Sequence, residues 1–185
     1  MRRVALVSLA VLLVGAPVLA REVAGVTLAP TITIDGRSLA LNGAGLRTRF
    51  FFKVYVIGLY LEHPSTDAAA ILAADETRRA DLRLLRALPG PEIADAIGRA
   101  FEQNAGPAAP ALHERLTRFE AMFPSVAVGD AITLTYAPGP GVTVAVNGRA
   151  VGVIPGKDFA DVLFSVWIGA APIDATLKQA LLTGP

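Results

Sequence analysis

The sequence predicts an α+β fold in which an antiparallel sheet packs against helices on one side. Strand-like segments come first, two amphipathic helices follow, and three short strands and two further helices complete the chain. Strands grouped apart from helices are typical of α+β domains, whereas strands and helices alternate along the chain in domains with a parallel sheet. The second observation is the run 49–61, in which ten of thirteen residues are neither charged nor glycine. Such a run predicts a buried strand.

The first strands precede residue 62. Residues 26–41 have strand character, interrupted at Pro30 and at the Asp35-Gly36 turn. Because residues 49–61 are apolar on both faces, we expect this strand at the centre of the sheet, covered on both sides.

A short helix, a strand and a longer helix are expected next. Asp67 can accept hydrogen bonds from free helix N–H groups, so it predicts a helix through Ala74. Residues 81–87 read as another strand. After the break at 89–91, a helix opens at Glu92 and has apolar side chains four residues apart at Ile93, Ile97 and Phe101.

The C-terminal half predicts one helix, a β-meander and two more helices. The first helix has a 3.6-residue apolar period at Leu112, Leu116, Phe119 and Phe123. Alternating residues predict strands at 132–136, 142–146 and 149–154, with an Asn147-Gly148 hairpin turn. Asp158 is expected to begin a helix through Val166 or Trp167, and Asp174 another through Leu182.

The N-terminus has the pattern of a secretory signal peptide. Arg2 and Arg3 precede a short apolar stretch, and Ala20 is a small residue at the expected cleavage position. The stretch is shorter than the ~20 residues that a membrane-spanning helix needs. We therefore expect residues 1–20 to be a signal peptide and residues 21–185 to be one domain that is exported to a periplasm, with no stable membrane anchor after cleavage.

Composition and motifs exclude several functions. Without Arg2 and Arg3 the 17 basic side chains become 15, against 16 acidic ones, so the total charge gives no case for binding nucleic acid or an anionic membrane surface. With no cysteine, and with only the isolated histidines His63 and His113, we expect no metal site and surface positions for both rings. No P-loop, nucleophile elbow or complete dinucleotide fingerprint occurs. We expect no cofactor.

Arg47 is the first candidate for a binding residue. Gly43 and Gly45 predict a glycine-rich turn that delivers Arg47 to the apolar run. A cation beside a buried strand needs a carboxylate or another oxyanion, from the protein or from a ligand. Arg47 can also simply pair with an acidic neighbour or point to solvent, and Tyr55 can be an ordinary core tyrosine.

Two segments carry a resemblance to a known family. Residues 41–47 (LNGAGLR) and 52–61 (FKVYVIGLYL) resemble the chalcone isomerase superfamily, and the exported bacterial chalcone isomerase-like proteins most of all. Shorter segments at 128–130, 146–149 and 158–169 agree. The resemblance implies an open-faced β-sandwich, in which a long antiparallel sheet packs against a layer of helices with a ligand cleft between. Members of the superfamily include plant enzymes that cyclise chalcones, fatty-acid-binding proteins and non-catalytic homologues.

The resemblance assigns roles to two residues of the first segments. Arg47 matches the arginine that holds the phenolate in the plant enzymes and the lipid carboxylate in the fatty-acid binders. Tyr55 takes the place of a threonine that polarises the ketone through water in the plant enzymes, and the fatty-acid binders have tyrosine there.

Other matching positions lack the enzymes' groups. Pro91 and Gly98 stand where the plant enzymes supply a tyrosine and an asparagine, and neither can replace them. Ser165 is a hydroxyl equivalent near the last motif, with Val166 as the alternative alignment. Ring closure needs an oriented phenolate and a polarised carbonyl. The chain keeps the anion holder and loses most of the carbonyl machinery, which favours binding and predicts no catalytic residues.

The spacing of Arg47 and Tyr55 restricts how they can act together. In one straight strand, eight residues would separate their Cα atoms by roughly 26 Å. The segment must therefore bend or bulge near residues 48–50, or Arg49 takes the role, or the pair does not act together.

The leading hypothesis is a periplasmic, non-catalytic binding protein for a fatty acid or a similar amphipathic carboxylate. Arg47 would hold the charge, Tyr55 and Ser165 would contact the ligand, and the apolar wall would come from Phe50, Phe51, Phe52, Ile57 and Leu59. Two alternatives stay open: a chalcone isomerase-type intramolecular lyase, and a structural or partner-binding module of the envelope.

Overall fold

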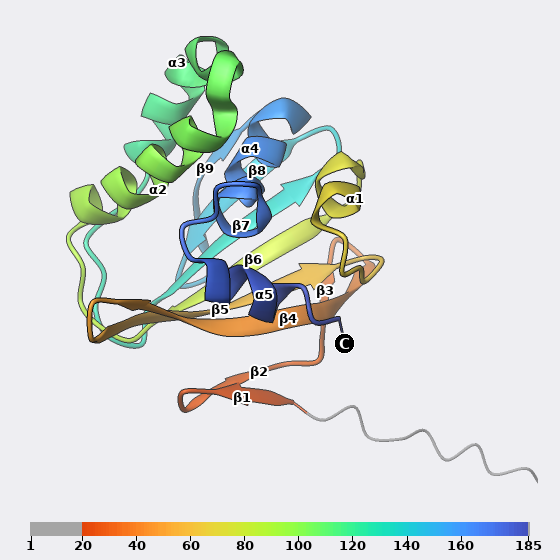
Figure 1. Cartoon of the computed structure of the whole chain (residues 1–185), viewed down its shortest axis with the longest axis vertical. Coiled ribbons are helices and arrows are strands. Elements are labelled where there is room, and N and C mark those ends of the chain that lie inside the picture. Colours follow the sequence, from red (N-terminus) through yellow and green to blue (C-terminus); the bar gives the residue numbers. More distant parts are fainter. Residues whose placement is uncertain (1–19, 185) are drawn as a thin grey trace, which may run out of the picture.

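A computed structural model describes residues 20–184, and its centre is a seven-stranded antiparallel sheet (Figure 1). Each strand pairs with the one before it in the chain. The strands are β3 (Thr31–Ile34), β4 (Arg37–Arg49), β5 (Phe52–Leu61), β6 (Arg78–Leu84), β7 (Ala131–Ala137), β8 (Gly141–Val146) and β9 (Arg149–Ile154). The predicted α+β class is confirmed. Residues 1–19 of the expected signal peptide lie outside the described residues.

The helices cover one face of the sheet, and a small hairpin covers the other (Figure 1). The helices are α1 (Ala68–Ala73), α2 (Gly90–Ala105), the short 3-10 helix η1 (Gly106–Ala108), α3 (Ala109–Glu120), α4 (Lys157–Ile168) and α5 (Ala175–Leu181). The hairpin pairs β1 (Arg21–Val23) with β2 (Val26–Leu28). The sequence did not predict β1.

Two hydrophobic cores lie on the two faces of the sheet. The larger core packs β5 to β8 against the helices around Phe101, Phe119 and Phe159. The ring centroid of Phe159 lies 4.9 Å from that of Phe101 and 5.7 Å from that of Phe119, the latter edge to face. The smaller core lies under β1–β2 and includes Val56. Strand β5 contributes to both, so the predicted cover on its two faces is confirmed. In the described part of the chain the buried residues of both cores lie between residues 28 and 181, so a polypeptide that begins at Ala20 contains all of these.

The predicted long strand 49–61 is wrong at its N-terminal end. Strand β4 runs to Arg49, the chain reverses at Phe50 and Phe51, and β5 begins at Phe52. The predicted glycine-rich turn is also wrong, because Gly43 and Gly45 lie inside β4. The reason for the glycines is the close approach of a helix, described below.

Most other predicted elements are confirmed with shifted ends. The strand expected at 81–87 is β6, three residues earlier, and the meander β7–β9 is at its expected place. Asp67 caps α1 through the N–H groups of Ala69 and Ala70. Asp174 caps α5 through the N–H of Leu177. Local side-chain chemistry predicted both helix starts.

A buried arginine that the sequence did not reveal joins α1 and α4 to the sheet. Arg78 on β6 is 2% exposed. It donates to the carbonyls of Ile71 and Ala74 at 2.9 and 3.1 Å and to Asp161 at 2.5 Å. Its guanidinium also stacks on the ring of Tyr136. A buried charge that is paired in this way stabilises the fold only while its partners remain.

Within residues 20–184 we find neither a helix long and apolar enough to cross a membrane nor a His, Cys, Asp and Glu cluster that could hold a metal ion. His63 and His113 are exposed, as predicted.

Candidate functional site

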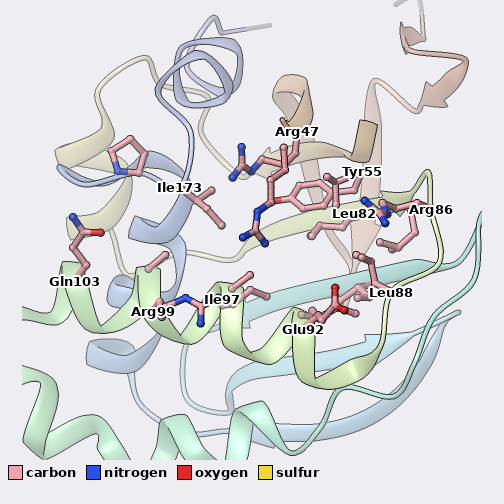
Figure 2. Close-up of a pocket in the computed structure, with 18 residues that line it drawn as sticks. Arg47, Tyr55, Leu82, Arg86, Leu88, Glu92, Ile97, Arg99, Gln103 and Ile173 are labelled. Atoms are coloured by element: carbon pink, nitrogen blue, oxygen red, sulfur yellow. The ribbon is translucent and has the colours of Figure 1, made fainter. Parts of the chain in front are cut away.

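A cavity of about 400 Å³ lies between the sheet and α2 (Figure 2). Its floor comes from β5, β6 and β7, one wall comes from α2, and the link between α4 and α5 closes it at Pro172 and Ile173. Asn104 on α2 fixes that link, since its amide donates to the carbonyl of Ala171. The apolar lining residues are Val54, Leu82, Leu84, Leu88, Ile93, Ala96, Ile97, Ala100, Ile132, Pro172 and Ile173.

The glycines of β4 let α5 lie directly on the strand. A Cβ atom at Gly43 would meet the backbone carbonyls of Ala180 and Leu181, and one at Gly45 would lie 2.6 Å from Cδ1 of Leu177. Arg47 is the next residue on the same face of β4, because side chains alternate along a strand. The helix therefore begins beside Arg47, and its capping residue is within reach of the guanidinium.

Arg47 forms an ion pair with Asp174, the capping residue of α5. Nη1 of Arg47 donates to Oδ2 of Asp174 at 2.9 Å and to the carbonyl of Thr48 at 2.5 Å. Both charged side chains are 17% exposed, and Arg47 lines the cavity. In the described part of the chain these bonds engage only Nη1, so the N–H groups on Nη2 and Nε are available to a ligand. Arg47 therefore pairs with an acidic neighbour, which is one of the alternatives that the sequence left open, and it also lines a cavity.

Tyr55 offers a second hydrogen-bond donor to the same cavity. Its hydroxyl oxygen accepts a hydrogen bond from Nε1 of the buried Trp167 at 3.0 Å. Among residues 20–184 no acceptor bonds its O–H, so that proton can be donated to a ligand. Burial raises the pKa of Tyr55 to about 12, which outweighs the opposing effects of the Trp167 hydrogen bond and the Arg47 charge. The hydroxyl is therefore a neutral donor.

The structure shows how Arg47 and Tyr55 come to lie side by side. The turn at residues 50–51 makes them direct partners across β4 and β5, and directly opposed residues have Cβ atoms about 5 Å apart. The register slips between Arg47 and Thr48, leaving Val54 as an extra residue on β5. Bulges of this kind often redirect side chains beside functional sites. The chain therefore has the bend near residues 48–50 that joint action of Arg47 and Tyr55 requires.

Several predicted site residues lie away from the cavity. Ser165 on α4 is buried and donates to the carbonyl of Val162 at 2.6 Å, and it does not line the cavity. Ile57 and Leu59 belong to the core. The predicted wall of Phe50, Phe51 and Phe52 is wrong, because these side chains are 83%, 99% and 62% exposed. They lie at or beside the hairpin turn, which the assumed continuous strand did not allow for.

Arg86, Glu92 and Arg99 line the cavity but were not predicted as site residues, whereas the sequence analysis considered Arg49 as an alternative to Arg47. Arg49, Arg86 and Arg99 join Arg47 in the lining, and Glu92 is the acidic residue there (Figure 2). Arg99 also pairs with Asp95 on the surface of α2 at 3.2 Å. The apolar face of α2 was predicted from its period, but nothing local shows that Arg86 and Arg99 border the same space as Arg47. The site therefore combines an apolar interior with an excess of positive charge.

Comparison with known proteins shows which family this fold belongs to. No curated protein sequence matches the chain. A crystal structure of a fatty-acid binding protein from Arabidopsis thaliana is similar with a TM-score of 0.70 and 18% sequence identity, covering 89% of this chain and 95% of that one. The sequence profile of the family described as chalcone isomerase-like matches residues 20–183. The open-faced β-sandwich and the predicted resemblance are therefore confirmed, and the chain belongs to the chalcone isomerase-like family.

Proposed function

We propose that this protein is a non-catalytic binding protein for a fatty acid or a similar amphipathic carboxylate, held in the cavity between the sheet and α2. The observation that carries the proposal is the pairing of Arg47 and Tyr55 across two strands, at one side of a cavity whose floor is largely apolar. The similar Arabidopsis protein is a fatty-acid binding protein, which supports the same ligand class.

The donors suit a carboxylate. The free N–H groups of Arg47 and the hydroxyl proton of Tyr55 can together bond the two oxygens of one carboxylate. Charge-assisted hydrogen bonds are roughly twice as strong as neutral ones. Asp174 neutralises Arg47 in the unliganded protein, while Arg49 and Arg86 keep the site attractive to anions.

The rest of the cavity suits an apolar tail. A volume of about 400 Å³ lies within the usual range for ligand pockets. Leu82, Leu84 and Ile132 form a floor without polar side-chain atoms. Each methylene removed from water there contributes about 0.8 kcal/mol. An acyl chain gains from this floor in proportion to its length.

We also propose that the protein acts in a periplasm after export. The charged and apolar pattern of residues 1–20 supports this step. Intact-mass measurement of the protein from a periplasmic extract tests it: cleavage after Ala20 is expected, and an uncleaved chain in the cytoplasm would refute it.

Ligand binding is tested on the polypeptide 20–185, whose single tryptophan, Trp167, contacts Tyr55 and reports on the site. Titration with a fatty acid should change the fluorescence of Trp167. The fatty alcohol of equal length should bind with an affinity that is lower by a factor of about ten or more. Mass spectrometry of a solvent extract should identify bound lipids. A protein that contains no lipid and binds no added fatty acid would refute the function.

Two variants separate the anion site from general effects. Arg47→Gln should weaken fatty-acid binding by about tenfold to a hundredfold and leave alcohol binding unchanged. Arg83→Gln is the matched control, because Arg83 lies on the same sheet, outside the cavity lining, and pairs with Asp81. Equal losses in both variants would show that Arg47 has no specific role.

A further inference from the structure

The turn between β4 and β5 presents an exposed aromatic tip, which we define as Phe50, Phe51 and Phe52. Six large apolar side chains are exposed in the described part of the chain, and three of them are these consecutive phenylalanines. Isolated exposed apolar residues are ordinary, but a contiguous exposed patch marks an interaction site. The other three, Val128, Val151 and Val153, are separate from the tip in sequence.

The backbone of the tip is strained. Phe50 has a φ of 55°, a left-handed conformation in which a bulky side chain is an outlier. Two-residue hairpin turns favour glycine or asparagine where φ is positive. The chain thus places a large apolar side chain where the fold itself would prefer glycine. Strained positions of this kind cluster at binding sites.

Cations surround the aromatic tip. Cζ of Arg49 lies over the ring of Phe50, 5.7 Å from its centroid, and Cζ of Arg86 lies over the ring of Phe52, 5.2 Å from its centroid. Lys53 follows directly and is exposed. The near-zero total charge therefore conceals a local basic cluster beside the phenylalanines. Apolar side chains flanked by lysine and arginine are typical of segments that enter the surface of an anionic bilayer.

The tip also borders the cavity. Arg49 and Arg86, which stack on the phenylalanines, line the cavity as well. A surface that held the tip would therefore lie next to the cavity. An apolar ligand could then move between the bilayer and the cavity with little exposure to water.

We propose that the aromatic tip with Arg49, Lys53 and Arg86 is a reversible docking site for an anionic phospholipid bilayer. The phenylalanines enter the interface between headgroups and acyl chains, and the three cations contact lipid phosphates. Docking uses surface side chains only and does not require a ligand in the cavity, so it stands or falls separately from the proposed function.

The test is flotation of the polypeptide 20–185 with vesicles of phosphatidylcholine alone or mixed with phosphatidylglycerol. Three cations should raise partitioning onto the anionic vesicles by about tenfold or more, and added salt should reverse the gain. Phe51→Ser should lower partitioning by about tenfold or more. Lys53→Gln should lower it by about fivefold on anionic vesicles and leave it unchanged on neutral ones.

Val153→Ser on the edge strand β9 is the matched control, because it removes an exposed apolar side chain four strands away from β5. It should partition like the unaltered protein. Since Phe51 is 99% exposed, Phe51→Ser should retain the unfolding free energy and the fatty-acid affinity in solution. No binding to anionic vesicles, or equal binding by Phe51→Ser, would overturn the proposal. A concentration-dependent dimer that Phe51→Ser abolishes, without vesicle binding, would instead assign the tip to a second copy of the chain.

Discussion

Asp174 has two separable tasks, and substituting it tests how the anion site is built. Oδ1 caps α5 at 3.0 Å from the N–H of Leu177, while Oδ2 pairs with Arg47 at 2.9 Å. Asp174→Asn keeps an oxygen for the cap and removes the charge. Asp174→Ala removes both interactions. The two variants therefore distinguish the helix cap from the ion pair.

The stability effects follow from these two bonds. Loss of a capping side chain costs about 1 kcal/mol, and loss of a hydrogen bond to a charged group costs about 2 kcal/mol. We expect Asp174→Ala to lower the unfolding free energy by about 3 kcal/mol and Asp174→Asn by about 2 kcal/mol. Urea unfolding followed by Trp167 fluorescence measures both values.

The same substitution should change ligand affinity in the other direction: Asp174→Asn is expected to bind a fatty acid more tightly, although it lowers the stability of the fold. In the unaltered protein the Asp174 carboxylate repels a ligand carboxylate that binds the remaining nitrogens of Arg47. At a separation of roughly 6 Å and an effective dielectric constant of about 20, this repulsion is about 3 kcal/mol, and solvent at the cavity mouth reduces it. We therefore expect Asp174→Asn to bind a fatty acid about tenfold more tightly than the unaltered protein, a gain of about 1.4 kcal/mol. Binding of the fatty alcohol should not change.

Asp67→Asn is the matched control, because Asp67 caps α1 in the same way and does not line the cavity. It should leave fatty-acid affinity unchanged. Weaker fatty-acid binding by Asp174→Asn would refute the reasoning, since it would mean that Asp174 holds Arg47 in a productive position rather than competing with the ligand.

Three further predictions concern the fold around the site. Gly43→Ala should lower the unfolding free energy by about 2 to 3 kcal/mol, because the added Cβ would meet the backbone carbonyl oxygens of Ala180 and Leu181, the latter at 2.5 Å. Gly45→Ala should lower it by less, because the nearest atom there is the movable Cδ1 of Leu177 and the Cβ of Ala180 is at 2.9 Å; equal effects in urea unfolding would contradict this. Arg78→Leu should cost about 3 kcal/mol by the same measurement, because it leaves the carbonyls of Ile71 and Ala74 without their donor, and a neutral result would show that this pairing adds no stability. Burial raises the pKa of Tyr55, Tyr60 and Tyr136 from 10.0 to about 12, so the folded state binds these protons more tightly than the unfolded state. The stabilisation of the folded state by these three groups should therefore be fully present below pH 10 and be lost between pH 10 and 12. Phenolate absorbance should then rise together with unfolding, and phenolate that forms near pH 10 in a folded protein would disprove it.

Local patterns predicted much of the fold. Asp67 and Asp174 were recognised as helix starts, and the meander β7–β9 was predicted from alternation and the Asn147-Gly148 turn. The hairpin at residues 50–51 was missed because its turn contains no glycine, asparagine or proline, the usual signals of a chain reversal. Its phenylalanines looked like strand interior. Periodicity cannot distinguish one long apolar strand from two strands joined by an apolar turn.

The candidate site was predicted less completely, because its members meet only in three dimensions. Arg47 was chosen first as a cation beside a buried strand and then from the family resemblance, Tyr55 was chosen from the resemblance, and both line the cavity. The partner of Arg47 is 127 residues away in the chain, and the partner of Tyr55 is 112 residues away. No local pattern reports contacts at such separations. Ser165 was placed by an alignment that could slip by one residue, and α4 turns it toward its own backbone.

The chemistry of the cavity favours binding over ring closure. Catalysis of ring closure needs groups that stabilise the transition state more than the bound substrate, chiefly donors placed where charge develops on the carbonyl. Arg47 and Tyr55 are direct partners across β4 and β5, so in the proposed binding mode both donate to the same end of a ligand. Pro91 and Gly98 supply no side-chain donor, and neither lines the cavity. With its pKa at about 12, Tyr55 stays protonated and donates. In the proposed function an anion is held at its charged end, and the apolar floor of Leu82, Leu84 and Ile132 contacts the rest of the ligand. Apolar contacts of this kind stabilise ground state and transition state alike.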